Sequence, residues 1–248
     1  MPKPEGPQGP DFPARPVRQF FTSRRGGVSP SPYDSFNLGD HVGDHEDNVR
    51  ANRARLARLV GLDEQNLVWM EQIHSPNITV VEYPTDQPVP ATDALITATP
   101  KLGMCVLVAD CVPVLLSDPQ APLVAAVHAG RMGARNGIVR RTVERMVELG
   151  AIPSRMHALI GPAASGDFYE VPEAMAADVE RHLSGARTTT LKQTPGLDLR
   201  AGIINQLYAL GVRSIDCDHR CTISDQQFFS YRRDGNTGRQ AGVIYITS

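Results

Sequence analysis

Residues 102–129 read LGMCVLVADCVPVLLSDPQAPLVAAVHA and hold the most apolar part of the chain. Three apolar runs lie in this stretch, at residues 104–109, 114–116 and 123–127, and Asp and Pro residues separate them. Runs of this length bounded by turn-forming residues are typical of buried β-strands. The stretch therefore predicts three strands at the centre of the fold.

Shorter apolar runs extend this pattern in both directions, at residues 67–70, 78–82, 94–97 and 156–160 and near Ile215 and Val243. Helical spacing of apolar residues predicts helices at residues 45–60, 138–149, 172–183 and 198–210, with Asp44 and Asp198 as N-terminal caps. The strands cluster first, the helices follow at irregular intervals, and no change in composition marks a boundary. The sequence therefore predicts one α+β layered domain over residues 17–248.

The composition excludes several classes of protein. A chain of 248 residues with 41% hydrophobic residues and a formal net charge of -2 can bury a full core, but it lacks the basic excess typical of proteins that bind polymeric nucleic acid. Asp110 interrupts the longest apolar stretch, so no membrane span is expected. Residues 1–16 hold six of the 20 prolines and no apolar run, which predicts a disordered leader and no secretory signal. We therefore expect a cytoplasmic protein whose four cysteines are reduced thiols or metal ligands.

Reactive side chains stand at the ends of two central strands. Asp110 and Cys111 follow residues 104–109, and His128 follows residues 123–127. His74, in the loop after residues 67–70, completes a set of one cysteine and two histidines, which matches a zinc site with an open fourth position. A thiolate nucleophile with a histidine base would use the same Cys111 and His128. A purely structural role, with Cys111 packed as a small hydrophobic residue, is a third interpretation, and the residues alone leave all three open.

Three further segments carry polar side chains that could bind a ligand. Residues 130–137, rich in Gly and Arg, suit either an anion site or a tight turn between a strand and a helix. Cys217, His219 and Cys221 would share one face of a predicted strand, but packing is the favoured interpretation because no fourth ligand is near in the sequence. The arginines in residues 231–239 could contact an anion, although a solvated hairpin is favoured there.

Several motifs together resemble the laccase-domain family, also called multicopper polyphenol oxidoreductases. In chain order they are Asn37-Leu38-Gly39, His41-Val42-Gly43-Asp44, Asn52-Arg53, Gln72-Ile73-His74-Ser75, Asp93-Ala94-Leu95-Ile96-Thr97, Ala109-Asp110-Cys111-Val112-Pro113, Val127-His128-Ala129-Gly130 and Phe228-Phe229-Ser230-Tyr231-Arg232-Arg233. The likeness runs from about Phe20 to the C-terminus, so it covers residues 17–248 as the catalytic domain.

The resemblance implies a single α/β/β/α domain with mixed sheets and a zinc site at His74, Cys111 and His128. It also implies phosphorolysis of adenosine, inosine, guanosine and methylthioadenosine and deamination of adenosine, with Asn37 and Arg53 as substrate-binding residues. Two departures matter. The family's usual His-Ala-Gly-Trp-Arg-Gly reads His128-Ala129-Gly130-Arg131-Met132-Gly133 here, and a cysteine common before Tyr-Glu-Val is replaced by the pair Asp167-Phe168.

The leading functional hypothesis is therefore a zinc-dependent purine nucleoside phosphorylase that uses Cys111 and His128, with Asp110 as a neighbouring proton carrier. Zinc would lower the pKa of bound water to about 7 for attack on the purine of adenosine, and an arginine would hold phosphate for phosphorolysis. A copper-dependent polyphenol oxidase is an alternative, but the chain has seven histidines and no His-x-His pair. A metal-free Cys/His hydrolase and a zinc-stabilised binding module are the other two hypotheses.

Overall fold

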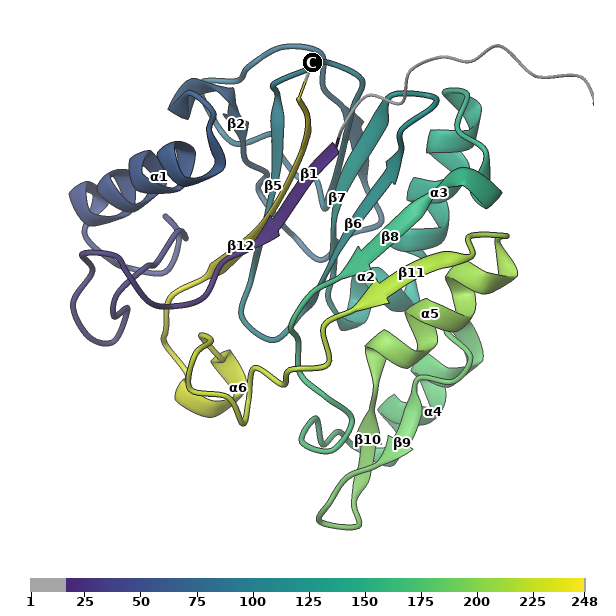
Figure 1. Cartoon of the computed structure of the whole chain (residues 1–248). Helices are drawn as coiled ribbons and strands as arrows, with labels where there is room; N and C mark the ends of the chain where they lie inside the picture. The colour runs from purple at the N-terminus through teal and green to yellow at the C-terminus, as the bar shows by residue number, and fades with distance from the viewer. Residues whose placement is uncertain (1–16, 248) are drawn as a thin grey trace, which may run out of the picture.

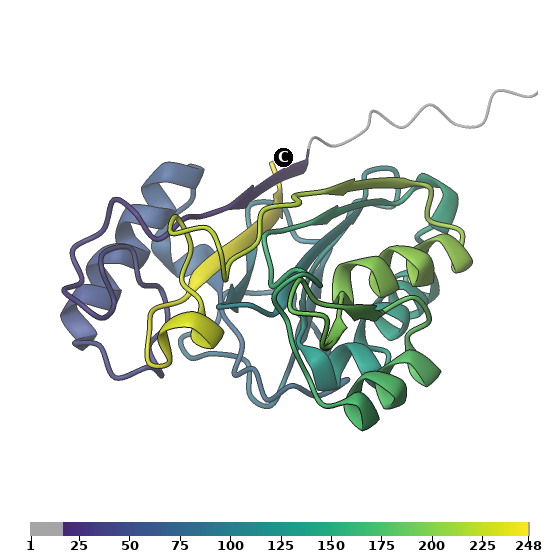
Figure 2. The same ribbon diagram turned by 90° about the horizontal axis from the view of Figure 1, so that it is seen from below.

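The computed structural model describes residues 17–247, which fold into two mixed sheets that pack face to face between two helical layers (Figures 1 and 2). The four-stranded sheet has the order β1 (Val17–Phe21), β12 (Gln240–Ile246), β5 (Gly103–Val108) and β2 (Leu67–Val68). The six-stranded sheet has the order β11 (Ser214–Cys217), β8 (His157–Ile160), β6 (Val112–Asp118), β7 (Leu123–Ala129), β4 (Ala94–Thr97) and β3 (Ile78–Val80). The predicted α/β/β/α arrangement is confirmed.

The central stretch supplies strands to both sheets. β5 lies in the four-stranded sheet, whereas β6 and β7 are neighbours in the six-stranded sheet, so the chain crosses from one sheet to the other at residues 109–111. In β5, Met104, Val106 and Val108 face the core between the sheets, while Cys105 and Leu107 face the opposite side. This alternation follows from the two-residue period of a strand whose two faces are both covered.

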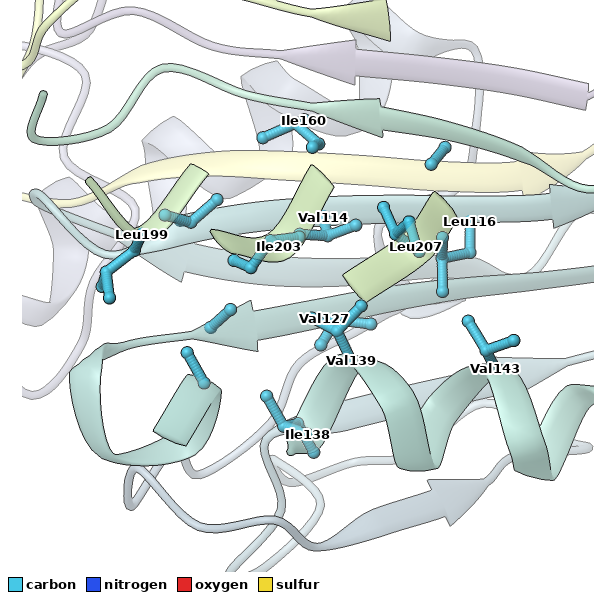
Figure 3. Close-up of a cluster of buried hydrophobic side chains, with 14 of the residues drawn as sticks. Val114, Leu116, Val127, Ile138, Val139, Val143, Ile160, Leu199, Ile203 and Leu207 are labelled. Carbon is cyan, nitrogen blue, oxygen red and sulfur yellow. The ribbon is translucent and has the colours of Figure 1, made fainter. Parts of the chain in front are cut away.

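Helices cover the outer face of each sheet. α1 (Glu46–Val60) lies over the four-stranded sheet through Leu56 and Val60. α2 (Arg131–Arg135), α3 (Ile138–Glu148), α4 (Glu173–His182) and α5 (Leu199–Ala209) lie on the six-stranded sheet (Figure 2). Figure 3 shows side chains of α3 and α5 gathered over those of β6 and β7, namely Val139, Val143, Ile203 and Leu207 over Val114, Leu116 and Val127.

Several elements differ from the sequence-based expectations. The cap of α1 is His45, whose side chain accepts the Asp47 N–H, so the assignment of Asp44 as the cap was wrong. Asp198 does cap α5 by accepting the Ala201 N–H. The sequence did not predict five elements, namely β1, the paired strands β9 (Arg187–Thr189) and β10 (Pro195–Leu197), α2, and α6 (Tyr231–Asp234). The short 3₁₀ turns Glu64–Asn66 and Pro153–Arg155 complete the described elements.

Among residues 17–247, no helix has the length and apolar character needed to cross a membrane. The predicted leader, residues 1–16, lies outside the described residues.

Candidate functional site

Strand register brings Cys111 next to His128. β6 and β7 are antiparallel, with Val112 opposite Ala129 and Pro113 opposite His128. Cys111, the residue just before β6, therefore lies at the end of β7 that carries His128. The sequence placed His128 after a strand, but the structure places it inside β7, one residue before the strand ends. This position makes His128 almost fully buried, with 3% of its surface exposed.

A buried carboxylate, Asp93, joins the two histidines. Asp93 immediately precedes β4, which pairs with β7, and its Oδ1 accepts a hydrogen bond from Nδ1 of His128 at 2.8 Å. The same carboxylate accepts the backbone N–H groups of Ile73, His74 and Ser75 and the hydroxyl of Ser75. His74 has a left-handed backbone with φ of 59°, which this set of hydrogen bonds stabilises. Asp93 therefore orients the imidazole of His128 and the whole His74 loop.

The three predicted ligands meet. The ligand atoms of His74, Cys111 and His128 all lie within 4.8 Å of one another, and Cys111 Sγ is 3.8 Å from His74 Nε2. Tetrahedral zinc with usual bond lengths holds sulfur and nitrogen ligands about 3.6 Å apart. Nδ1 of His128 is engaged by Asp93, which leaves Nε2 of that ring for a metal, as in carboxylate-histidine-zinc arrangements. The donor set and spacing fit a divalent transition metal.

The charges of the site are strongly coupled. Burial raises the pKa of Cys111, but the nearby His128 and then His74 outweigh it and lower this pKa to about 6. Burial lowers the pKa of His128, but the thiolate of Cys111 and the carboxylate of Asp93 raise it to about 9. Burial raises the pKa of Asp93, and hydrogen bonds from His128 and Ser75 reverse the effect and bring it to about 2. These shifts favour a thiolate on Cys111 and an imidazolium on His128, and the imidazolium is hydrogen-bonded to the ionised carboxylate of Asp93.

Gly130 leaves the space that the side chains of His74 and Cys111 occupy. A Cβ at this position would lie 2.6 Å from Cδ2 of His74 and 3.0 Å from Sγ of Cys111. Both contacts are shorter than van der Waals separations allow, so a side chain here would displace the ligands.

The trio opens into a cavity of about 250 Å³. Its walls come from the His74 loop, the crossing between β5 and β6, and the segment around α6; the lining residues are His41, Gln72, His74, Leu107, Val108, Ala109, Cys111, His128, Tyr231 and Arg239. Both ends of the Gln72 side-chain amide hydrogen-bond to the backbone of Leu107, which fixes the His74 loop against β5. Cys111 therefore lines this cavity.

Asn37 and Arg53 lie beside the cavity and are absent from its described lining. Asn37 is fully buried, and its Oδ1 accepts the backbone N–H groups of Gly39 and Arg239. Arg53 donates to the carbonyl of Leu38, pairs with Asp40 at 3.1 Å and stacks on Trp69 in a neighbouring open cleft. Both residues thus brace residues 37–41, the segment that carries His41 to the cavity.

The side chain of Asp110 bonds to the segments that carry Thr222 and Arg232. Its carboxylate accepts the hydroxyl of Thr222 and the backbone N–H of Arg232, each at 2.6 Å, and its φ of 94° places it in the left-handed region. It therefore ties the residue before Cys111 to the start of α6, whose Tyr231 lines the cavity.

The other candidate segments fold differently from their predicted forms. Residues 131–135 form the helix α2, and Arg135 there pairs with Asp178 of α4 at 2.5 Å. β11 ends at Cys217, so the prediction that Cys217, His219 and Cys221 alternate along one strand was wrong. The hairpin expected at residues 231–239 is instead α6 followed by a loop that leads to β12.

Sequence reasoning missed two residues of the candidate site, Asp93 and Arg239. A fully buried aspartate directly before an apolar strand was a usable signal for Asp93, because such a carboxylate needs several donors. Arg239 lies in a segment whose arginines were assigned mainly to solvent, and only the fold brings it into the cavity wall.

Comparison with known proteins agrees with this architecture. The family model described as multi-copper polyphenol oxidoreductase laccase matches residues 18–247. A purine nucleoside phosphorylase of Corynebacterium glutamicum is 62% identical over 94% of this chain and 95% of its own, and one of Mycobacterium tuberculosis is 54% identical over 93% and 92%. The crystal structure of a Bacillus licheniformis hypothetical protein, YfiH, superposes with a TM-score of 0.87 at 33% identity, covering 93% of this chain and 92% of that one. The chain therefore belongs to the multi-copper polyphenol oxidoreductase laccase family.

Proposed function

We propose that this chain is a zinc-dependent purine nucleoside phosphorylase that also deaminates adenosine. The observation that carries the proposal is the convergence of His74, Cys111 and His128 in one cavity that also contains the guanidinium of Arg239. The names of the curated relatives support the phosphorylase activity, since several at 39% to 62% identity are named purine nucleoside phosphorylase. The substrates would be adenosine, inosine, guanosine and methylthioadenosine, with phosphate.

His74, Cys111 and His128 would hold the metal, and Asp93 would hold the two histidines. Zinc supplies a Lewis acid that stabilises negative charge developing on a reacting group. The chain provides the rest of the machinery: the thiolate is already favoured, and the Nδ1 of His128 is fixed on Asp93. The site therefore needs little reorganisation to accept a divalent ion.

In phosphorolysis an oxygen of phosphate attacks C1′ of the ribose while the bond from C1′ to the purine nitrogen breaks. The electron pair and a proton go to the purine, so the products are the free base and ribose 1-phosphate. Because charge moves from phosphate to base during this step, fixed cations and hydrogen-bond donors contribute most of the rate acceleration. In the deamination, the oxygen of water bonds to C6 of adenosine and the bond from C6 to the amino nitrogen breaks, so the products are inosine and ammonia and no phosphate is consumed.

Asn37, Arg53 and Asp110 would act on the substrate through the loops that they fix. Asn37 and Arg53 hold residues 37–41 in place, and Asp110 holds α6. The four cysteines are all free, which supports a role in the reducing cytoplasm.

One competing function has a specific observation in its favour. The pair formed by Cys111, with a pKa lowered to about 6, and His128 is the kind of pair that thiol hydrolases use. Such an enzyme would be insensitive to chelators and would be inactivated by alkylation. Copper at the same three ligands, giving phenol oxidation, is the other competing function, because copper binds such sites more tightly than zinc.

Elemental analysis and turnover test the proposal together. Protein purified without chelators or nickel is measured for metal content and then given adenosine or inosine, with and without phosphate, and the products are separated by chromatography. Cys111→Ala removes one ligand, and Cys217→Ala is the matched control because that free thiol lies outside the cavity.

Near-stoichiometric zinc and phosphate-dependent release of hypoxanthine from inosine, both lost in Cys111→Ala and kept in Cys217→Ala, would support the proposal. Conversion of adenosine to inosine without phosphate would support the deaminase activity. Zinc protein inert toward every nucleoside would contradict both. Bound copper with phenol oxidation, or amide hydrolysis that resists chelators, would favour a competing function.

A further inference from the structure

Arg239 is a cation in the cavity wall without a carboxylate partner. Its Nη1 donates to the carbonyls of Thr237 at 2.9 Å and Gly238 at 3.0 Å. Within residues 17–247 no ion pair and no further hydrogen bond involves its Nε or Nη2. Burial lowers the pKa of Arg239, although Cys111, Asp110 and Tyr231 offset part of the effect. Within residues 17–247, two nitrogens of this guanidinium, Nε and Nη2, thus have no partner at the wall of the cavity.

Four other arginines near the site make different contacts, and one of them, Arg131, donates to the sulfur of Met132. Arg135 pairs with Asp178 at 2.5 Å, and Arg53 pairs with Asp40 and stacks on Trp69. Arg232 donates to the carbonyl of Glu170. Asp110, the one carboxylate that acts electrostatically on Arg239, accepts its hydrogen bonds from Thr222 and from a backbone N–H instead.

The stem of Arg239 is held rigidly by residues 37–39. The backbone N–H of Arg239 donates to Oδ1 of Asn37 at 2.9 Å, and its carbonyl accepts the N–H of Leu38 at 3.0 Å. A Cβ on Gly39 would lie only 2.8 Å from Cγ of Arg239, so the side chain rests against bare backbone. Such a clamp removes conformational freedom before any ligand binds, which favours affinity.

Buried cations are normally paired, and a guanidinium presents its donors in a planar fork that matches the oxygens of phosphate. We propose that Arg239 binds the phosphate co-substrate, a tetrahedral oxyanion, through Nε and Nη2, and that Gly39 is a positioning residue that allows the side chain to reach the cavity. This assignment rests on the proposed phosphorylase function. The same chemistry would suit the phosphate of a nucleoside monophosphate, so the test includes both.

Phosphate binding to the metal-loaded protein is measured by calorimetry, separately from turnover. Arg239→Gln should raise the dissociation constant for inorganic phosphate by about 10-fold to 100-fold, the usual contribution of hydrogen bonds to a charged partner. Arg239→Lys should restore part of the affinity, because it keeps the charge and loses the fork. Arg135→Gln is the control and should leave phosphate binding unchanged, because Asp178 already occupies that guanidinium.

Kinetics provide the second readout. In Arg239→Gln and Gly39→Ala, the KM for phosphate should rise at least fivefold while the KM for inosine changes less than twofold. Gly39→Ala keeps the guanidinium of Arg239 but shifts the aliphatic part of that side chain. A rise in the KM for phosphate alone would therefore indicate lost positioning, because a general loss of structure would raise both KM values. Zinc content and the melting temperature verify that each variant is folded and loaded.

A measurement on the unmodified chain covers the case in which the Arg239 variants do not fold. Phenylglyoxal modifies exposed guanidinium groups, and inorganic phosphate should slow its reaction at Arg239 and not at Arg135, as mapped by mass spectrometry. Absence of protection, or equal phosphate affinity in wild type and Arg239→Gln, would overturn the assignment. Protection by adenosine 5′-monophosphate and none by inorganic phosphate would also overturn it and would identify a nucleotide site.

The two proposals can fail separately. If wild type binds phosphate through Arg239 but releases no base from inosine, the phosphorylase function fails and the anion site stands. If wild type and Arg239→Gln cleave inosine with the same KM for phosphate, the phosphorylase function stands and the role of Arg239 fails.

Discussion

Asp93 and His128 hydrogen-bond to each other twice, once through their side chains and once through their backbones. Nδ1 of His128 lies 2.8 Å from Oδ1 of Asp93, and the N–H of His128 donates to the carbonyl of Asp93 at the same distance. The pairing of β4 with β7 sets the backbone contact, and the backbone contact sets the side-chain contact. Sheet register therefore determines the orientation of the His128 imidazole toward His74 and Cys111.

Asp93→Asn should weaken zinc binding by about 10-fold to 100-fold, because the amide is a poorer acceptor for Nδ1 of His128 and for the N–H groups of the His74 loop. Competition with a chromophoric chelator measures the affinity. Asp118→Asn is the matched control: Asp118 is equally buried at the far end of β6, where it binds Arg155. This control should lose stability and keep its zinc affinity. Equal zinc affinity in Asp93→Asn and wild type would contradict the assigned role.

Gly130→Ala should abolish stoichiometric zinc binding while the fold survives, because the new methyl group would overlap His74 and Cys111. Elemental analysis and circular dichroism test the two halves of this expectation. Gly133→Ala, three residues later in α2, is the control, because its new Cβ would lie 3.3 Å and 3.4 Å from two backbone oxygens and would need only a small shift. Full zinc loading of Gly130→Ala would show that the ligands can move aside.

In metal-free protein, alkylation of Cys111 by iodoacetamide should rise with pH through about 6 and level off near pH 7, since the thiolate is the reactive form. An unperturbed thiol would instead titrate near 8.5. His128→Asn removes the main stabilising charge and should move the midpoint upward. Peptide mapping separates Cys111 from Cys105, whose burial raises its pKa. A wild-type midpoint near 8.5 would rule out the thiolate-imidazolium pair.

Asp93 should also make the metal-free protein sensitive to acid. Its pKa is about 2 in the folded chain and about 3.9 in an unfolded one, so its ionisation stabilises the fold above about pH 4. That contribution, of about 2 to 3 kcal/mol, is lost as the pH falls through about 2. Urea unfolding between pH 2 and 6 measures this contribution, and in Asp93→Asn the free energy of unfolding should vary less with pH. If the free energy of unfolding of this variant varied with pH as in wild type, a group other than Asp93 would be responsible for the proton uptake.

The core strands were predictable from sequence, and the sheet to which each belongs was not. Buried runs such as residues 104–109 and 123–127 have a simple apolar signature, and β5 and β7 match them closely. Assigning β5 and β7 to different sheets depends on contacts with β12, more than 130 residues later in the chain. β1, with its mixed polar and apolar residues, becomes a strand because β12 offers it a partner.

The ligand trio was predictable because cysteine and histidine carry recognisable chemistry at strand ends. The supporting residues were less visible. Asp93 meets His128 because of the register between β4 and β7, and no local sequence pattern encodes that register. Arg239 reaches the cavity because its backbone N–H donates to Asn37, about 200 residues earlier in the chain. Arg53, which the resemblance assigns to substrate binding, stacks on Trp69 in another cleft, and its role toward substrate stays a prediction.

Two of the three candidate ligands come from segments that join the two sheets, and the third, His128, lies in β7 of the six-stranded sheet. His74 lies between β2 of one sheet and β3 of the other, and Cys111 lies where the chain crosses from β5 to β6. A bound ion would therefore cross-link His74 and Cys111, which are 37 residues apart in the chain, and would hold the two sheets together. Ligand binding to the folded state alone stabilises it by mass action. Cells starved of metal should then lose the protein itself to proteolysis, and its abundance should report on metal supply.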